Sequence, residues 1–126
     1  MGKSIARIAT LAALTLGFFT LTSAQIQQLP RSFVASPGIY KVAAQNEQYK
    51  VIAVTWRPGQ KDALHSHPAN AVYYLTDCSL RIHEQDGAFR DVQPKAGSAI
   101  VQAQIPGHVL ENIGTTDCRL VMFESS

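Results

Sequence analysis

Beyond residue 37, the sequence consists of short apolar runs separated by turn residues, without the long period of an amphipathic helix. The strongest run, residues 49–56 (YKVIAVTW), is rich in β-branched and aromatic residues and largely apolar on both alternating faces. Runs of this kind at regular spacing are typical of β-sandwiches and barrels. We predict strands at 38–44, 49–56, 62–67, 72–76, 80–83, 89–92, 98–103, 108–113 and 118–123.

The turn residues between these runs predict an antiparallel arrangement. Asp86-Gly87 has the chemistry of a hairpin turn and should join the strands at 80–83 and 89–92. About nine short antiparallel strands make one all-β domain over residues 38–126. An immunoglobulin-like sandwich and a jelly roll both fit, and the number of strands does not choose between them.

The first 24 residues have the features of a secretory signal peptide. Lys3 and Arg7 give a positive start, residues 8–21 are apolar and uncharged, and small residues precede a cut after Ala24. A membrane-spanning helix needs about 20 apolar residues, which is longer than this run. The pattern therefore favours a cleaved signal, with no membrane anchor afterwards and a periplasmic or secreted product.

The mature chain is expected to have an irregular arm at residues 25–37, which carry glutamine, proline and serine. Lys3 and Arg7 leave with the signal peptide. Nine basic and nine acidic residues then remain, so the mature chain is formally neutral. No basic cluster survives, and this argues against a nucleic-acid partner.

The chain has two cysteines, Cys78 and Cys118. An even number of cysteines in an exported protein favours a disulfide, because the compartment is oxidising. Two unpaired thiols are the alternative.

Two histidines lie two residues apart in the predicted strand at 62–67. His65 and His67 project from the same face, since side chains alternate along a strand. Pro68 follows at once and places the pair near a strand end. Two imidazoles so placed can approach one metal ion, although two solvated surface histidines are the alternative.

Two spaced motifs surround the histidines. In the first, Gly59 is followed by five residues and then by His65-Ser66-His67. In the second, Gly97 leads through Pro106-Gly107 to His108 and then, after three residues, to Asn112. With these motifs, over about residues 40–124, the chain resembles the cupin superfamily. The runs HSHPANAVYYLTD and ENIGTTD are similar to those of small bacterial single-domain cupins.

The resemblance implies a cupin-type jelly-roll β-barrel with one metal ion on His65, His67 and His108. It also implies that the strand ending near residue 77 lies antiparallel to the last strand. Cys78 would then lie near Cys118, which is the disulfide that the composition favours.

One departure from the family pattern concerns the metal site. The first motif usually continues to a glutamate, which should fall at about Asn70 to Val72, and no carboxylate is in reach there. The resemblance then implies a three-histidine site with open positions. Such a site suits a divalent transition metal (Fe, Zn, Ni, Mn or Cu) better than Mg or Ca.

Other side chains are weaker candidates. Tyr73 and Tyr74 lie on opposite strand faces, so one should line the cavity, as a packed aromatic or as an acid–base group. Glu111 should face away from His108 unless a bulge intervenes. His83 is expected to be solvated.

We therefore expect an exported, metal-dependent enzyme of oxygenase, isomerase or lyase type that acts on a small molecule. The alternative is a non-catalytic module that binds a small ligand or a metal. A third possibility is an interaction protein, because cupins often form homodimers through their sheets and the arm could exchange with a neighbour.

Overall fold

The computed structural model describes residue 2, residues 10–19 and residues 27–126. The predicted cleavage site after Ala24 lies outside the described residues, as does much of the predicted signal peptide. Residues 10–19 have no regular secondary structure. None of the helices in the described part of the chain has the length and apolar character needed to cross a membrane.

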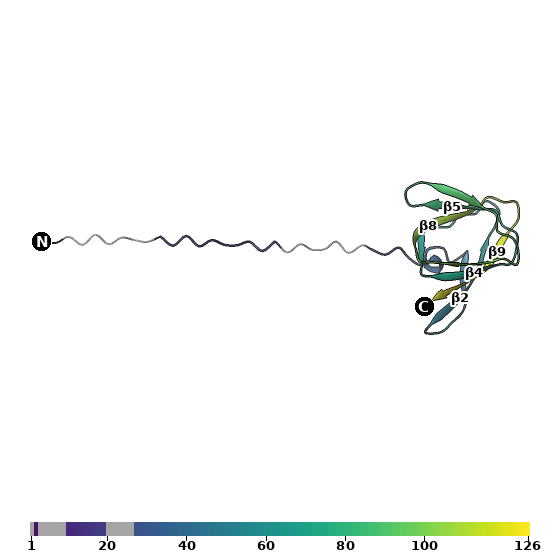
Figure 1. Cartoon of the computed structure of the whole chain (residues 1–126), viewed down its shortest axis with the longest axis horizontal. Coiled ribbons are helices and arrows are strands. Elements are labelled where there is room, and N and C mark those ends of the chain that lie inside the picture. The colour runs from purple at the N-terminus through teal and green to yellow at the C-terminus, as the bar shows by residue number, and fades with distance from the viewer. Residues whose placement is uncertain (1, 3–9, 20–26) are drawn as a thin grey trace.

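The domain is built from two antiparallel sheets, as Figure 1 shows, with β5 and β8 on one side and β2, β4 and β9 on the other. The five-stranded sheet has the order β1 (Tyr40–Gln45), β2 (Tyr49–Trp56), β9 (Cys118–Ser125), β4 (Asn70–Tyr74) and β7 (Ala99–Gln102). The four-stranded sheet has the order β3 (His65–His67), β8 (Ile105–Asn112), β5 (Leu80–Glu84) and β6 (Phe89–Val92). The prediction of an all-β jelly roll is confirmed for the described residues.

Two strands, β2 and β6, have the predicted bounds, and the predicted hairpin of β5 and β6 is present. The largest difference is at Pro106-Gly107, which we expected to form a bend before a strand at 108–113. These residues instead lie inside β8, where the register against β3 shifts between His65 and His67. Proline lacks a backbone N–H, so such an irregularity in the ladder is one of the few places where a strand accepts it.

The expected irregular arm contains one turn of helix, α1 (Ser32–Ala35). Just before this helix, Arg31 forms an isolated parallel bridge with Ser66 of β3. The arm therefore lies against the strand that carries two of the histidines.

The core lies between the two sheets and follows the alternation of the strands. In β9, Cys118, Leu120, Met122 and Glu124 are buried, whereas the residues between them are more exposed. β2 buries Ile52, Val54 and Trp56 in the same way. One face of each of these two strands therefore fills the barrel. The presence of an acid among the inward residues of β9 is unusual.

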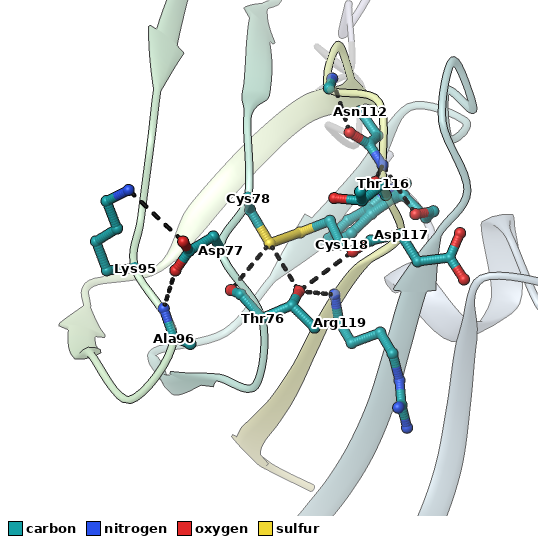
Figure 2. The surroundings of a disulfide bond; sticks show 12 residues. Thr76, Asp77, Cys78, Lys95, Ala96, Asn112, Thr116, Asp117, Cys118 and Arg119 are labelled. Carbon is teal, nitrogen blue, oxygen red and sulfur yellow. Dashed lines mark hydrogen bonds and ion pairs between the residues drawn. A yellow bond between two sulfur atoms is a disulfide. The ribbon is translucent and has the colours of Figure 1, made fainter.

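A disulfide joins Cys78, which follows β4, to Cys118 at the start of β9, with their Cα atoms 5.0 Å apart. β4 and β9 are antiparallel neighbours, so the pairing implied by the resemblance is present. Figure 2 shows that Thr76 supports it: the hydroxyl of Thr76 accepts a hydrogen bond of 2.9 Å from the backbone N–H of Arg119. A disulfide of this kind is typical of proteins in oxidising compartments.

The asparagine of the second motif has a structural role close to this disulfide. The Asn112 side chain donates hydrogen bonds to the backbone carbonyls of Trp56 and Thr116 and accepts one from Gly114 N–H. Figure 2 shows the bond to Thr116. Asn112 thereby fixes the loop that leads into β9.

Candidate metal centre

The three predicted histidines meet inside the barrel. His65 and His67 come from β3, and His108, which pairs directly with His65, comes from β8. All three side chains are buried, and one ring nitrogen from each lies within 4.8 Å of the other two. These residues form a group that could hold a metal ion.

The hydrogen bonds of two rings determine which nitrogen faces the centre. His65 Nδ1 lies 2.7 Å from the carbonyl oxygen of Ala63, and His67 Nδ1 lies 2.5 Å from Glu124 Oε1. A carbonyl and a carboxylate only accept hydrogen bonds, so both Nδ1 atoms carry the proton. The two Nε2 atoms are 2.8 Å apart, and in the neutral rings each directs a lone pair at the other. A cation between them would remove this repulsion.

His108 adds a third unsatisfied nitrogen. Its Nε2 atom is buried and has no hydrogen-bond partner among the described residues. Burial, followed by the charges of His65, His67 and Arg90, lowers the pKa of His108 to about 3. Burial also lowers the pKa of His65. Neutral imidazoles are the form that binds metals, so the donor set fits a divalent transition metal.

The separations fit an ion after small movements of the rings. Metal–nitrogen bonds of about 2.1 Å in a tetrahedral site place neighbouring nitrogens about 3.4 Å apart. The contact between His65 and His67 is shorter than this value, and the widest separation in the group, 4.8 Å, is longer. The rings would therefore have to shift to place all three nitrogens on one ion.

A carboxylate reaches the site from an unexpected strand. The motif positions Asn70 to Val72 carry no carboxylate, but Glu124 of β9 contacts His67. Glu124 pairs across the sheet with Asn70, the first of the positions (70–72) at which the family pattern places its glutamate. Asn70 itself donates to Pro68 O and accepts from Gln102. The signal in the sequence was the period of two, which puts Glu124 on the inward face of β9.

Glu124 is held as an ion by its partners. Its side chain is fully buried, and its second oxygen accepts a hydrogen bond of 2.7 Å from Arg31. Burial by itself raises the pKa of Glu124, but the hydrogen bonds from His67 and Arg31 outweigh it and leave the pKa below its ordinary value. The sequence pattern gave no indication of Arg31, which lies in the arm.

A second buried carboxylate, Asp62, lies behind His65. Asp62 accepts hydrogen bonds from Tyr40 Oη at 2.7 Å, from Trp56 Nε1 at 3.2 Å and from the backbone N–H of Leu110 at 2.7 Å. Tyr40 Oη also lies 3.4 Å from His65 Nε2, which makes it the hydroxyl nearest to the inward nitrogen of that ring. Burial raises the pKa of Asp62, and burial and then the charge of Asp62 raise that of Tyr40.

The histidines open onto a cavity of about 670 Å³. His67 and His108 line it, and most of the remaining wall is apolar side chains from both sheets. Tyr74 is buried and lines this cavity, whereas Tyr73 is 45% exposed on the outer face. Of the two tyrosines, Tyr74 is therefore the one placed to meet a ligand. Polar residues also line the cavity: Glu84, Arg90, Gln93, Ser98, Gln102 and Gln104.

Two further candidates lie apart from this group. His83 is half-buried, and its Nε2 atom bonds to Glu111 Oε2 at 2.9 Å. Neither residue belongs to the histidine group or lines the cavity. Glu111 therefore does not approach the candidate centre.

Comparison with known proteins finds similarity at the level of structure. A cupin domain from Bordetella pertussis Tohama I matches with a TM-score of 0.65 and 22% identity, over 79% of this chain and 98% of that one. An uncharacterised conserved protein with a double-stranded β-helix domain from Klebsiella pneumoniae matches with a TM-score of 0.56 and 21% identity, over 69% of this chain and 75% of that one.

A third structure, a cupin superfamily protein from Desulfitobacterium hafniense DCB-2, matches with a TM-score of 0.52 and 8% identity, over 69% of this chain and 75% of that one. No protein-family model matches the sequence, and no curated protein matches it either. At these identities the solved structures show a shared fold and not a shared activity.

Proposed function

This chain has the cupin fold, and we propose that it binds one divalent transition-metal ion on His65, His67 and His108. The observation that carries the proposal is the convergence of three buried imidazoles: the Nε2 atoms of His65 and His67 face each other, and that of His108 has no partner among the described residues. Buried polar atoms are rarely left without a partner. One metal ion would satisfy all three nitrogens at once.

The adjoining cavity supports the proposal that the protein also binds a small molecule. Its apolar wall suits a hydrophobic body, and Arg90 at its lining suits an anionic group. The nearest carboxylate to Arg90 is Glu84, whose Oε1 atom lies 3.7 Å from Arg90 Nε, beyond normal hydrogen-bond length. The guanidinium therefore retains donors for a ligand.

We infer that the protein is an enzyme of oxygenase, isomerase or lyase type. A metal bound here would supply Lewis-acid polarisation of a ligand oxygen. His67 and His108 would border both the ion and the ligand, and Tyr74 could donate a hydrogen bond from the cavity wall.

The second candidate is a non-catalytic binding module, and one observation favours it. The hydroxyl nearest to the histidines, that of Tyr40, already donates to Asp62, and its pKa is raised. It is therefore a poor proton acceptor at neutral pH, so this hydroxyl does not supply the centre with a base. A metal-loaded protein that converts a chelating carboxylate or enol would exclude this candidate.

The test of metal binding is elemental analysis of purified protein, together with titration by Zn²⁺, Fe²⁺ and Co²⁺. We expect about one ion per chain in the wild type and little in His67→Ala. His83→Ala is the matched control, because His83 is a half-buried histidine outside the group. If the wild type takes up no ion, or if His67→Ala retains it, the proposal is wrong.

We also propose that the protein is exported and cut after Ala24. The leader pattern and the disulfide support this proposal. Mass spectrometry of the protein from a periplasmic or culture fraction should show an N-terminus at Gln25. A full-length chain confined to the cytoplasm would contradict it.

A further inference from the structure

The N-terminal arm contacts both strands that carry the histidines. The carbonyls of Leu29 and Pro30 accept hydrogen bonds from Ser66, one from its hydroxyl at 2.8 Å and one from its N–H at 2.9 Å. Ser66 is buried between His65 and His67. Since β3 is an edge strand of its sheet, the arm covers that edge at the position of His65 and His67.

The arm also touches the strand of the third histidine. Gly107 precedes His108, and a Cβ atom added to it would lie only 2.5 Å from Leu29 Cδ1. A side chain at this position would therefore have to displace the ends of the Leu29 and Gln85 side chains. The Leu29 side chain occupies the room beside β8 that a larger residue would fill.

A chain of charged hydrogen bonds then links the arm to the centre of the barrel. Arg31 donates to Glu124 Oε2 at 2.7 Å and to the carbonyl of Ser125 at 3.0 Å. Glu124 Oε1 accepts from His67 Nδ1. Among the described residues, Arg31 and His67 are the partners of this buried carboxylate in ion pairs.

We propose that the arm residues Leu29, Pro30 and Arg31, together with Glu124, position the histidine site. Arg31 balances the buried charge of Glu124. Glu124 in turn holds the His67 ring with Nδ1–H outward and Nε2 toward His65 and His108. The consequence for a metal rests on the function proposed above, whereas the orientation of the His67 ring is a property of the protein itself.

The physical reason is that a buried carboxylate needs its partners. Without Arg31, the charge of Glu124 is paired only through His67, and rotation of the carboxylate away from His67 would bring it other partners. Such a rotation weakens the bond that orients His67. Loss of such an outer hydrogen-bond partner typically weakens metal binding about 10–100-fold.

The first test is titration with Co²⁺, followed by its visible absorption, on folded variants. We expect Arg31→Ala and Glu124→Gln to weaken Co²⁺ binding about 10–100-fold, and Arg31→Lys and Leu29→Ala to weaken it less. Arg119→Ala is the matched control, because Arg119 is an exposed arginine of β9 that faces away from the core. Thermal melts identify any variant that fails to fold. If Arg31→Ala or Glu124→Gln does not fold, the Co²⁺ affinities of the milder variants Arg31→Lys and Leu29→Ala test the proposal instead.

The second test does not need a metal. The ¹⁵N and ¹H NMR signals of the His67 ring in metal-free protein should show the proton fixed on Nδ1. In Glu124→Gln and Arg31→Ala we expect both neutral tautomers to be populated. Wild-type affinity and an unchanged His67 tautomer in these variants would overturn the proposal. If the wild type binds no Co²⁺, the function proposed above fails, and the NMR signals still decide whether the arm and Glu124 position the ring.

Discussion

The two buried carboxylates behind the histidine group, Asp62 and Glu124, differ in what surrounds them. Glu124 is paired with a guanidinium and an imidazole, and its pKa is below the ordinary value because these bonds outweigh burial. Asp62 accepts hydrogen bonds from neutral donors, and burial raises its pKa. Two acids at comparable depth therefore acquire different charge behaviour from their partners.

The difference also separates their roles. Glu124 bonds directly to a histidine ring, so its loss should act mainly on the site. Asp62 lies 3.7 Å from His65 Nδ1, which bonds instead to Ala63 O, and connects β1, β2 and β8 through its donors. We infer that Asp62 mainly stabilises the barrel, whereas Glu124 mainly orients a candidate metal ligand.

The largest expected effect comes from removal of the structural carboxylate. Asp62→Ala leaves three buried donors, on Tyr40, Trp56 and Leu110, without their acceptor. Each orphaned group costs about 1–3 kcal/mol, so the free energy of unfolding should fall by about 5 kcal/mol. Urea denaturation measures this change. Asp62→Asn keeps one acceptor oxygen and should cost less, and equal stability of Asp62→Ala and wild type would contradict the assigned role.

Removal of the disulfide should have the next largest effect, and it tests whether the stability of the whole domain and the geometry of the histidine site are independent. The disulfide closes a 40-residue separation at the end of β9 opposite to Glu124. By the chain-entropy relation, Cys78→Ala with Cys118→Ala should lower the free energy of unfolding by about 4 kcal/mol. Metal affinity at a temperature where the variant stays folded should not change. A matched loss of affinity would show that the barrel transmits strain to the centre.

The comparison of these carboxylates also shows which features of the fold and the site can be predicted from the sequence and which cannot. Strand period and turn chemistry located β2, β6 and the β5–β6 hairpin, because these signals are local. The spacing of His65, His67 and His108 indicated the site because family motifs preserve it. The link between Arg31 and Glu124 spans 93 residues, so local pattern contains no trace of it. This ion pair forms only when the N-terminal arm packs against the barrel, and that packing is a property of the three-dimensional fold.

A smaller effect concerns the pH dependence of the metal-free protein. The pKa of His108 is about 3 in the folded protein and 6.5 in the unfolded chain. Between pH 3 and pH 6.5, the unfolded chain therefore binds a proton at His108 that the folded protein does not bind. The contribution of His108 to the free energy of unfolding is therefore fully present above pH 6.5 and is lost as the pH decreases below it. At one unit of pKa per 1.36 kcal/mol, the loss from pH 6.5 to pH 5 is about 2 kcal/mol. Urea midpoints across this range measure it, and His108→Gln should show a flatter dependence.

The smallest expected effect distinguishes the two buried tyrosines. Tyr40→Phe removes one of the donors to Asp62 and should cost about 1 kcal/mol of stability. Tyr74 is buried and lines the cavity, and its side chain makes no hydrogen bond within the described residues. Tyr74→Phe should therefore change the free energy of unfolding by less than about 0.5 kcal/mol. If Tyr74 meets the ligand, the same variant should bind or convert that ligand less well, while Tyr73→Phe on the outer face should not. A stability loss in Tyr74→Phe as large as in Tyr40→Phe would instead make the hydroxyl of Tyr74 a structural group.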